Sequence, residues 1–335
     1  MRAATSIIVL AALLSVLPGV SRLSAEGAQT VIKIATMVPR TPELAIQEKR
    51  YNQQLQEGTN GRIKFQTYFS GSAGDDMTVM RKLRSGQIDG SPLSVDVVAQ
   101  FVHQCTILMA PQTFFNYKQV DAVRAELTPI FNKEAWDNGF KIMSWWDAGK
   151  VRIMSKKPIR TFADLRSGRP WLYPASALLK EFYKMTNVTG VPLDLNEVYG
   201  GLMTNMIDTV WISAVLGAAF RWSSQTQYVS ATPVDVLQGA FLLRKASWEA
   251  LSKEDQKIVE VVLADQTAKT QKQFREDDEK TFQKMQTHGS TAFAFANLKE
   301  WEDAGEKLRT HMIGRTYSKE LLDKVEAITK RYPGN

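Results

Sequence analysis

Residues 84–90 read Arg-Ser-Gly-Gln-Ile-Asp-Gly, and residues 203–209 read Met-Thr-Asn-Met-Ile-Asp-Thr. In both segments a helical pattern ends at a residue that tolerates the left-handed conformation, Gly86 or Asn205. An Ile-Asp pair then opens the next predicted strand, and the aspartate can accept a hydrogen bond from the backbone of its own turn. The same device at two places indicates two halves of similar construction.

The first half of the chain alternates short strands with helices. The predicted elements are strand Val31–Ala35, helix Pro42–Leu55, strand Ile63–Phe69, helix Asp75–Leu83 and a strand from Ile88. This β-α-β-α-β order predicts a parallel sheet with helices on its faces.

The second half repeats the alternation and then becomes helical. Its predicted strands are Val151–Ser155, Arg169–Tyr173, Val191–Leu193 and Ile207–Ile212, and its short helices are Phe162–Leu165, Ala175–Met185 and Glu197–Thr204. A helical pattern then runs from Ser252 to about Thr287, which corresponds to about 50 Å of helix. One lobe is narrower than that, so we expect this helix to cross both. Helices Leu298–Met312 and Ser318–Arg331 follow.

These elements predict an α/β protein of two lobes around a cleft. We expect residues 31–150 and 237–275 to form lobe I, and residues 151–236 and 276–335 to form lobe II. Ligands of open α/β sheets bind beyond the carboxyl ends of the strands, so the cleft is the expected binding site.

The N-terminus has the layout of a secretory signal peptide, with a buried or amphipathic first helix as the alternative. Arg2 supplies a positive charge, residues 7–17 form an apolar run, and small residues precede the expected cleavage after Ala25. Ser21 and Ala28 are alternative cleavage sites. The apolar run is shorter than the roughly 20 residues that a membrane-spanning helix needs. We therefore expect export to the periplasm.

Composition and motifs exclude several function classes. The formal charge of +7 is spread along the chain, so no nucleic-acid partner is expected. Cys105 is the single cysteine, which rules out an intramolecular disulfide and suggests a small buried side chain. The 3 histidines have no metal-ligand spacing, and there is no nucleophile elbow, dinucleotide fingerprint or P-loop. We expect no metal, no cofactor and no enzymatic activity.

Four groups of residues together resemble one family. They are GTNGRIKF (58–65) with FSG (69–71), RKLRSGQID (81–89), PI (158–159) with DL (164–165), and EVYGGL (197–202) with ID (207–208). In this order and spacing they are similar to the DctP-like substrate-binding subunits of tripartite ATP-independent periplasmic (TRAP) transporters. The resemblance implies a bilobal periplasmic-binding-protein fold with a long helix across both lobes, and delivery of the ligand to TRAP membrane permease subunits.

The sequence departs from this family where most members bind a carboxylate. The resemblance implies an arginine in the strand after the Asp-Leu turn, since a guanidinium offers parallel donors to both carboxylate oxygens. Here the matching residue is Trp171, or Tyr173 or Arg169 if the lengths differ by one. Other positions that are polar in acid-binding members also read as apolar. The candidate ligand-binding residues are Trp171, Tyr173, Trp211, Val151, Leu195, Ile212 and Trp146.

These residues predict a hydrophobic or amphipathic ligand rather than a dicarboxylate or a sugar acid. A sub-branch that lacks the arginine is similar to this chain and implies a possible tetratricopeptide-repeat partner. Trp145 and Trp146 are adjacent, so at most one of them faces the cleft. Each aromatic candidate could instead belong to the core. The alternatives are an organic-acid binder that uses Arg152 or Arg169, a periplasmic sensor or adaptor, and a periplasmic hydrolase.

Overall fold

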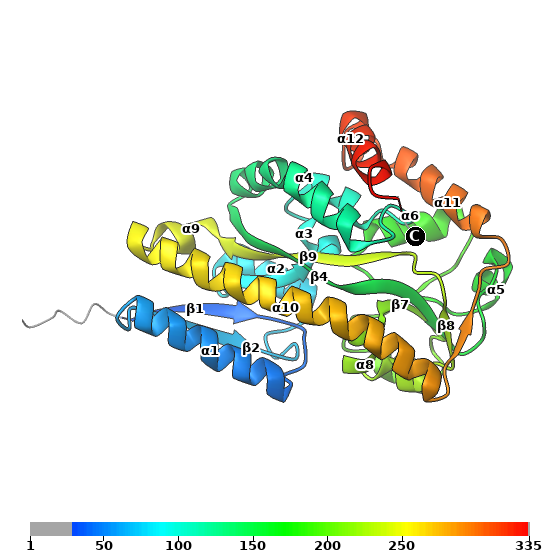
Figure 1. Ribbon diagram of the computed structural model, residues 1–335, viewed down its shortest axis with the longest axis horizontal. Coiled ribbons are helices and arrows are strands. Elements are labelled where there is room, and N and C mark those ends of the chain that lie inside the picture. The colour runs from blue at the N-terminus through cyan, green and yellow to red at the C-terminus, as the bar shows by residue number, and fades with distance from the viewer. Residues whose placement is uncertain (1–28, 334–335) are drawn as a thin grey trace, which may run out of the picture.

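The computed structural model describes residues 29–333 (Figure 1). The expected signal peptide, residues 1–25, lies outside the described residues. In the described part of the chain, no helix combines the length and the apolar character that a membrane span requires.

The central feature is a mixed sheet with the strand order β10-β8-β4-β9-β3-β1-β2, and β7 also pairs with β4. As predicted, the strands of the first half are parallel, because β1 pairs with β2 and β3 in that direction. However, β9 lies antiparallel between β3 and β4, so the sheet as a whole is not parallel. The strands are β1 Thr30–Ala35, β2 Ile63–Tyr68, β3 Gly90–Ser94, β4 Phe140–Ser155, β7 Thr209–Ser213, β8 Tyr228–Ser230, β9 Asp235–Arg244 and β10 Thr291–Phe293.

Strand β4 joins the two halves. The predicted strand Val151–Ser155 is only its last part, because β4 begins at Phe140 and has 16 residues. The first part of β4 pairs with β9, and residues 151–155 pair with β7. The register of β4 against β9 shifts between Asp147 and Lys150. The predicted boundaries between the lobes, at residues 150/151 and 236/237, lie at this irregularity.

A small second sheet lies beside β7. Strands β5 (Trp171–Leu172) and β6 (Val191–Pro192) pair in parallel, and a bridge between Pro170 and Thr209 connects β5 to β7. These strands are shorter than the predicted ones, because the chain leaves extended structure at Tyr173 and enters helix α6.

Helix α10 (Lys253–Thr287) has 35 residues, as the sequence predicted, and the Ser252 side chain caps its N-terminus. In Figure 1 this helix crosses the whole molecule, from beside α1 (Pro42–Gly58) and α9 to beside α8. The other helices are α2 Asp76–Ser85, α3 Val95–Val98, α4 Tyr117–Asp137, α5 Phe162–Ser167, α6 Ala177–Met185, α7 Val198–Met203, α8 Ala214–Ala219, α9 Lys245–Glu249, α11 Leu298–His311 and α12 Lys319–Lys330, with 3-10 turns η1 His103–Met109 and η2 Trp222–Gln225.

The two predicted helix stops are confirmed. Gly86 has φ 79° after α2, and Asn205 has φ 57° after α7. Both residues therefore turn the chain in the left-handed conformation, which glycine and asparagine tolerate best.

The aspartates that follow these stops have a different role from the predicted one. Asp89 accepts a hydrogen bond at 2.8 Å from the backbone N–H of Lys33 on β1. Asp208 accepts one at 2.9 Å from the backbone N–H of Arg169, just before β5. Each carboxylate thus ties its strand to a neighbouring strand rather than to its own turn, and both halves of the chain use the same contact.

Candidate functional site

A cavity of about 380 Å³ lies between the two halves of the chain. One side is formed beyond the carboxyl ends of β1, β2 and β3, where Met37, Phe69 and Ser94 lie. The other side comes from β5, β7 and α8, and residues of β4, β9 and α10 complete the wall. This is the place that the general rule for α/β sheets predicts for a ligand.

Six of the seven candidate residues line this cavity: Trp146, Trp171, Tyr173, Leu195, Trp211 and Ile212. Val151 does not. It is buried in the hydrophobic core, where it pairs across the sheet with Ser213 and Asp235. The sequence cannot separate the two positions, because buried core residues and residues of an apolar cavity wall are of the same type.

The two adjacent tryptophans of β4 separate as the alternation of a strand requires. Trp145 packs against Phe131 on α4, with the ring centroids 5.4 Å apart. Trp146 lines the cavity, and its ring lies directly over Gly239 of β9. A Cβ atom at residue 239 would lie 2.0 Å from this ring, so the glycine makes room for the tryptophan.

Trp171 belongs to both the core and the cavity wall. Its side chain is only 4% exposed, and its Nε1 donates a hydrogen bond at 2.8 Å to the carbonyl oxygen of Leu193. The ring lies 5.2 Å from that of Trp222 and 5.5 Å from that of Tyr173. Its indole N–H is therefore already satisfied by the protein, and the part of Trp171 that faces the cavity is apolar.

Tyr173 connects the two sides of the cavity. Its hydroxyl donates a hydrogen bond to the Oδ2 atom of Asp76, the first residue of α2. Desolvation raises the pKa of Asp76 to about 6, and neighbouring carboxyls on Asp75, Asp194 and Asp96 act in the same direction. Desolvation also raises the pKa of the Tyr173 hydroxyl.

Neither arginine of the acid-binder alternative reaches the cavity. Arg152 is buried and donates to the backbone carbonyl oxygens of Ser230 and Ala231, with its guanidinium 3.6 Å from the ring centroid of Phe282. The side chain of Arg169 is 57% exposed and lies 3.8 Å from the Asp208 carboxylate. Within the described residues, no arginine, lysine or histidine lines the cavity.

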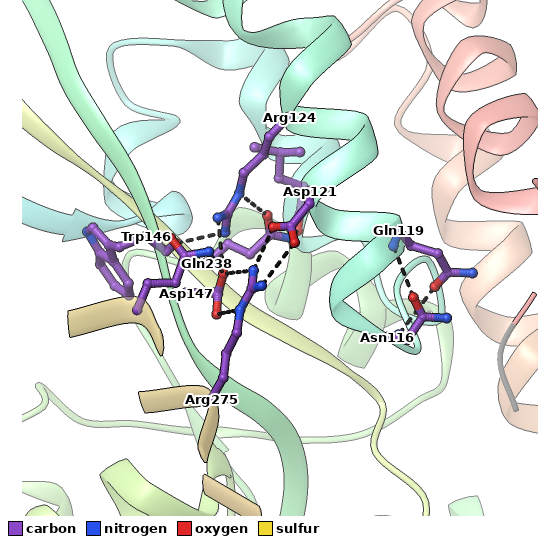
Figure 2. A network of polar contacts seen from close by, with 10 residues as sticks. Asn116, Gln119, Asp121, Arg124, Trp146, Asp147, Gln238 and Arg275 are labelled. Carbon is purple, nitrogen blue, oxygen red and sulfur yellow. Dashed lines mark hydrogen bonds and ion pairs between the residues drawn. The ribbon is translucent and has the colours of Figure 1, made fainter. Parts of the chain in front are cut away.

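The charged side chains that do line the cavity are Asp76, Asp96 and Asp147. Asp147 is fully buried and forms ion pairs with Arg124 at 3.1 Å and with Arg275 at 2.7 Å. Figure 2 shows that Arg275 reaches from α10 to Asp147 and also to Asp121 on α4. The charge of Asp147 is thus balanced within the protein.

Sequence reasoning missed the side of the cavity formed by the first half of the chain. There the wall contains apolar side chains from the ends of β1 and β2, the α1 helix and α10, as well as hydroxyl and amide groups. They include Met37, Leu44, Phe65, Phe69, Leu263, Phe274, Thr36, Gln47, Gln266 and Gln271. The carboxyl ends of the predicted parallel strands were the available signal. No signal in the sequence indicated the ion pairs of Asp147 with Arg124 and Arg275, because each of them joins residues that are distant in sequence.

Comparison with known proteins identifies the family to which the chain belongs. Residues 34–315 match the family model DctP, described as bacterial extracellular solute-binding protein, family 7. The ectoine/5-hydroxyectoine-binding periplasmic protein UehA of Ruegeria pomeroyi is 21% identical over 63% of this chain, and the match spans only 63% of that protein. The sialic acid-binding periplasmic protein SiaP of Vibrio cholerae is 22% identical over 65% of this chain and 70% of its own length.

The fold is also that of solved relatives. A TRAP periplasmic solute-binding protein from Sulfurospirillum deleyianum, solved with bound succinate, superposes with a TM-score of 0.81 at 19% identity. The superposition covers 90% of this chain and 100% of that one, and shows the bilobal α/β fold expected from the sequence. This chain therefore belongs to the DctP family of bacterial extracellular solute-binding proteins, family 7, whose members bind substrates for transport and are not enzymes.

Proposed function

We propose that this protein captures a small hydrophobic or amphipathic molecule in the periplasm and delivers it to the membrane permease subunits of a TRAP transporter. The observation that carries the proposal is the wall of the cavity, which is mostly aromatic and aliphatic and contains no basic side chain within the described residues. The ligand-binding residues that we propose are Trp146, Trp171, Tyr173, Leu195, Trp211 and Ile212.

The energetics favour an apolar ligand over an acid. A carboxylate transferred from water into this cavity would meet no opposite charge, and an unpaired buried charge costs several kcal/mol. Apolar surface gains roughly 25 cal/mol for each Å² that it buries. UehA, SiaP and the succinate-bound relative are named for polar ligands, so we infer that this chain differs from them in specificity.

The alternatives receive less support. The acid binder needs a guanidinium in the cavity, but Arg152 is bound to backbone carbonyl oxygens and Arg169 points to Asp208. A hydrolase is not supported by membership of a solute-binding family. A sensor or adaptor would use the same cavity, and the partner that the bound protein contacts would distinguish it. A tetratricopeptide-repeat partner remains a proposal from the resemblance alone.

Two measurements test the proposed function. Native mass spectrometry of the exported protein, purified without denaturation, should detect a bound lipophilic molecule. Isothermal titration calorimetry with succinate and with sialic acid should show no binding after that molecule has been removed. Tight binding of either acid, together with the absence of a lipophilic companion, would refute the proposal.

A further inference from the structure

We propose that the ligand carries a protonated amine, which Asp76 and Asp96 bind at one end of the cavity. The inference rests on the proposed function, because it assigns the polar end of a molecule whose body is apolar.

The two carboxyls belong to the same side of the cavity. Asp76 is the first residue of α2, and Asp96 lies in α3 directly after β3. Both line the cavity, and the pKa of each is shifted by its surroundings rather than by an arginine or a lysine. Ser94 lines the same part of the wall, and its hydroxyl is a hydrogen-bond neighbour of the Tyr173 hydroxyl. An ammonium group has three donors, and each carboxylate offers two acceptor oxygens, of which Tyr173 occupies one on Asp76.

The charges around this end of the cavity favour a cation. Asp147 has two arginine partners, whereas the charged groups that act on Asp76 are the carboxyls of Asp75, Asp96 and Asp194. A cation entering here gains from several carboxyls at once, and a carboxylate is repelled by the same groups.

The desolvation of Asp76 and Asp96 also favours a bound cation. It raises the pKa of Asp76 to about 6 and also raises that of Asp96, and within the described residues no basic side chain lines the cavity to oppose these shifts. A bound ammonium group would lower both pKa values and release a proton when Asp76 or Asp96 was protonated beforehand. Its affinity should therefore fall as the pH decreases below about 6, where the Asp76 carboxyl, surrounded by Tyr173, Asp75, Asp96 and Asp194, becomes neutral.

The test compares three probes with one apolar body and different polar ends: 3-phenylpropylamine, 3-phenylpropan-1-ol and 3-phenylpropanoate. Isothermal titration calorimetry at pH 7.5, on the exported protein freed of bound molecules, should show the amine to bind at least about tenfold more tightly than the alcohol, as expected for charge-assisted hydrogen bonds. The carboxylate should bind more weakly than the alcohol.

Two variants locate the effect. Asp76→Asn and Asp96→Asn keep the shape of the side chain but remove its charge, and each should lower the affinity for the amine by about tenfold with little change for the alcohol. Asp303→Asn removes an exposed carboxylate of α11 that pairs with Lys299, so it serves as the matched control and should change neither affinity. Circular dichroism melting should show that all three variants fold.

The outcomes separate the two proposals. If the alcohol or the carboxylate binds best, or if neither cavity variant affects the amine, the amine assignment is wrong while capture of an apolar molecule stands. If none of the three probes binds, the amine assignment is also wrong. Native mass spectrometry tests the proposed function separately, since it shows whether a lipophilic molecule is bound to the purified protein.

Discussion

Asp147 is the centre of a buried cluster of polar contacts in the cavity wall. It accepts hydrogen bonds from Arg124 of α4 and Arg275 of α10 (Figure 2). A third hydrogen bond comes from Gln271, also of α10. Arg124 also donates to Gln238 and to the carbonyl oxygen of Trp146. Because Trp146 lines the cavity, this cluster holds the backbone that carries one ring of the cavity wall.

Removing the Asp147 carboxylate should strongly destabilise the fold. Asp147→Ala leaves the buried Arg124 guanidinium without its ion-pair partner, and the loss of one member of a buried pair typically costs about 3–5 kcal/mol. Urea unfolding followed by circular dichroism measures this change. Asp303→Ala is the control, since the exposed pair with Lys299 should contribute at most about 1 kcal/mol. Equal losses in the two variants would contradict the role given to Asp147.

Asp76 should make the ligand-free protein less stable as the pH rises. Its pKa is about 6 in the folded protein, compared with the ordinary value of 3.8 that is expected in the unfolded chain. The folded protein therefore binds the proton more tightly than the unfolded chain does. Stability from this group is present at low pH and is lost between about pH 4 and pH 6. The melting temperature of Asp76→Asn relative to the natural protein should therefore increase from pH 4 to pH 7. A difference that is constant with pH would show that the Asp76 pKa is not raised.

At the scale of elements, β4 and α10 are held together at the irregular part of the strand. Asp278 of α10 is buried and accepts hydrogen bonds from the backbone N–H groups of Lys150 and Val215, at 2.9 and 3.1 Å. Gly149 has φ +98°, and a Cβ atom there would lie 2.4 Å from the Asp278 carboxyl. This irregular part of β4 therefore depends on a residue without a side chain.

Gly149→Ala should cost more stability than an alanine at a comparable position without this contact. Gly139 also has a positive φ, +86°, but no atom lies within 4 Å of the place that a Cβ atom would take there. Both substitutions carry the strain of a left-handed alanine, about 1 kcal/mol. The additional loss of stability in Gly149→Ala measures the clash of the new Cβ atom with Asp278 and Ser213. Chemical unfolding of both variants measures the two losses of stability. Equal losses would contradict this prediction, because they would mean that α10 moves away from the new Cβ atom without a loss of stability.

At the scale of the molecule, Tyr173 and Asp76 form a contact between the two predicted lobes. A hydrogen bond to a charged group contributes about 1.5–3 kcal/mol, which is enough to bias a hinged protein towards the closed form. Tyr173→Phe removes the donor with little change of shape. Small-angle X-ray scattering of the ligand-free variant should show a larger radius of gyration than that of the natural protein. Tyr332→Phe, at the exposed C-terminal end, is the control and should leave the radius unchanged.

Local interactions were readable in the sequence. The caps at Ser252 and Gly86, the 35-residue α10 and the alternation of strands with helices depend on residues that are near one another in the chain. The aromatic character of the cavity was also predictable, because it follows from residue types such as Trp171 and Trp211.

Contacts between distant segments were decided only by the tertiary structure. The antiparallel position of β9, the burial of Val151 in the core and the carbonyl groups that bind Arg152 all involve partners far away in sequence. The placement of Asp76 and Asp96 in one cavity belongs to the same class. The physical reason is that backbone propensity and hydrophobic periodicity act over a few residues, whereas strand register and charge pairing are set by the packing of whole elements.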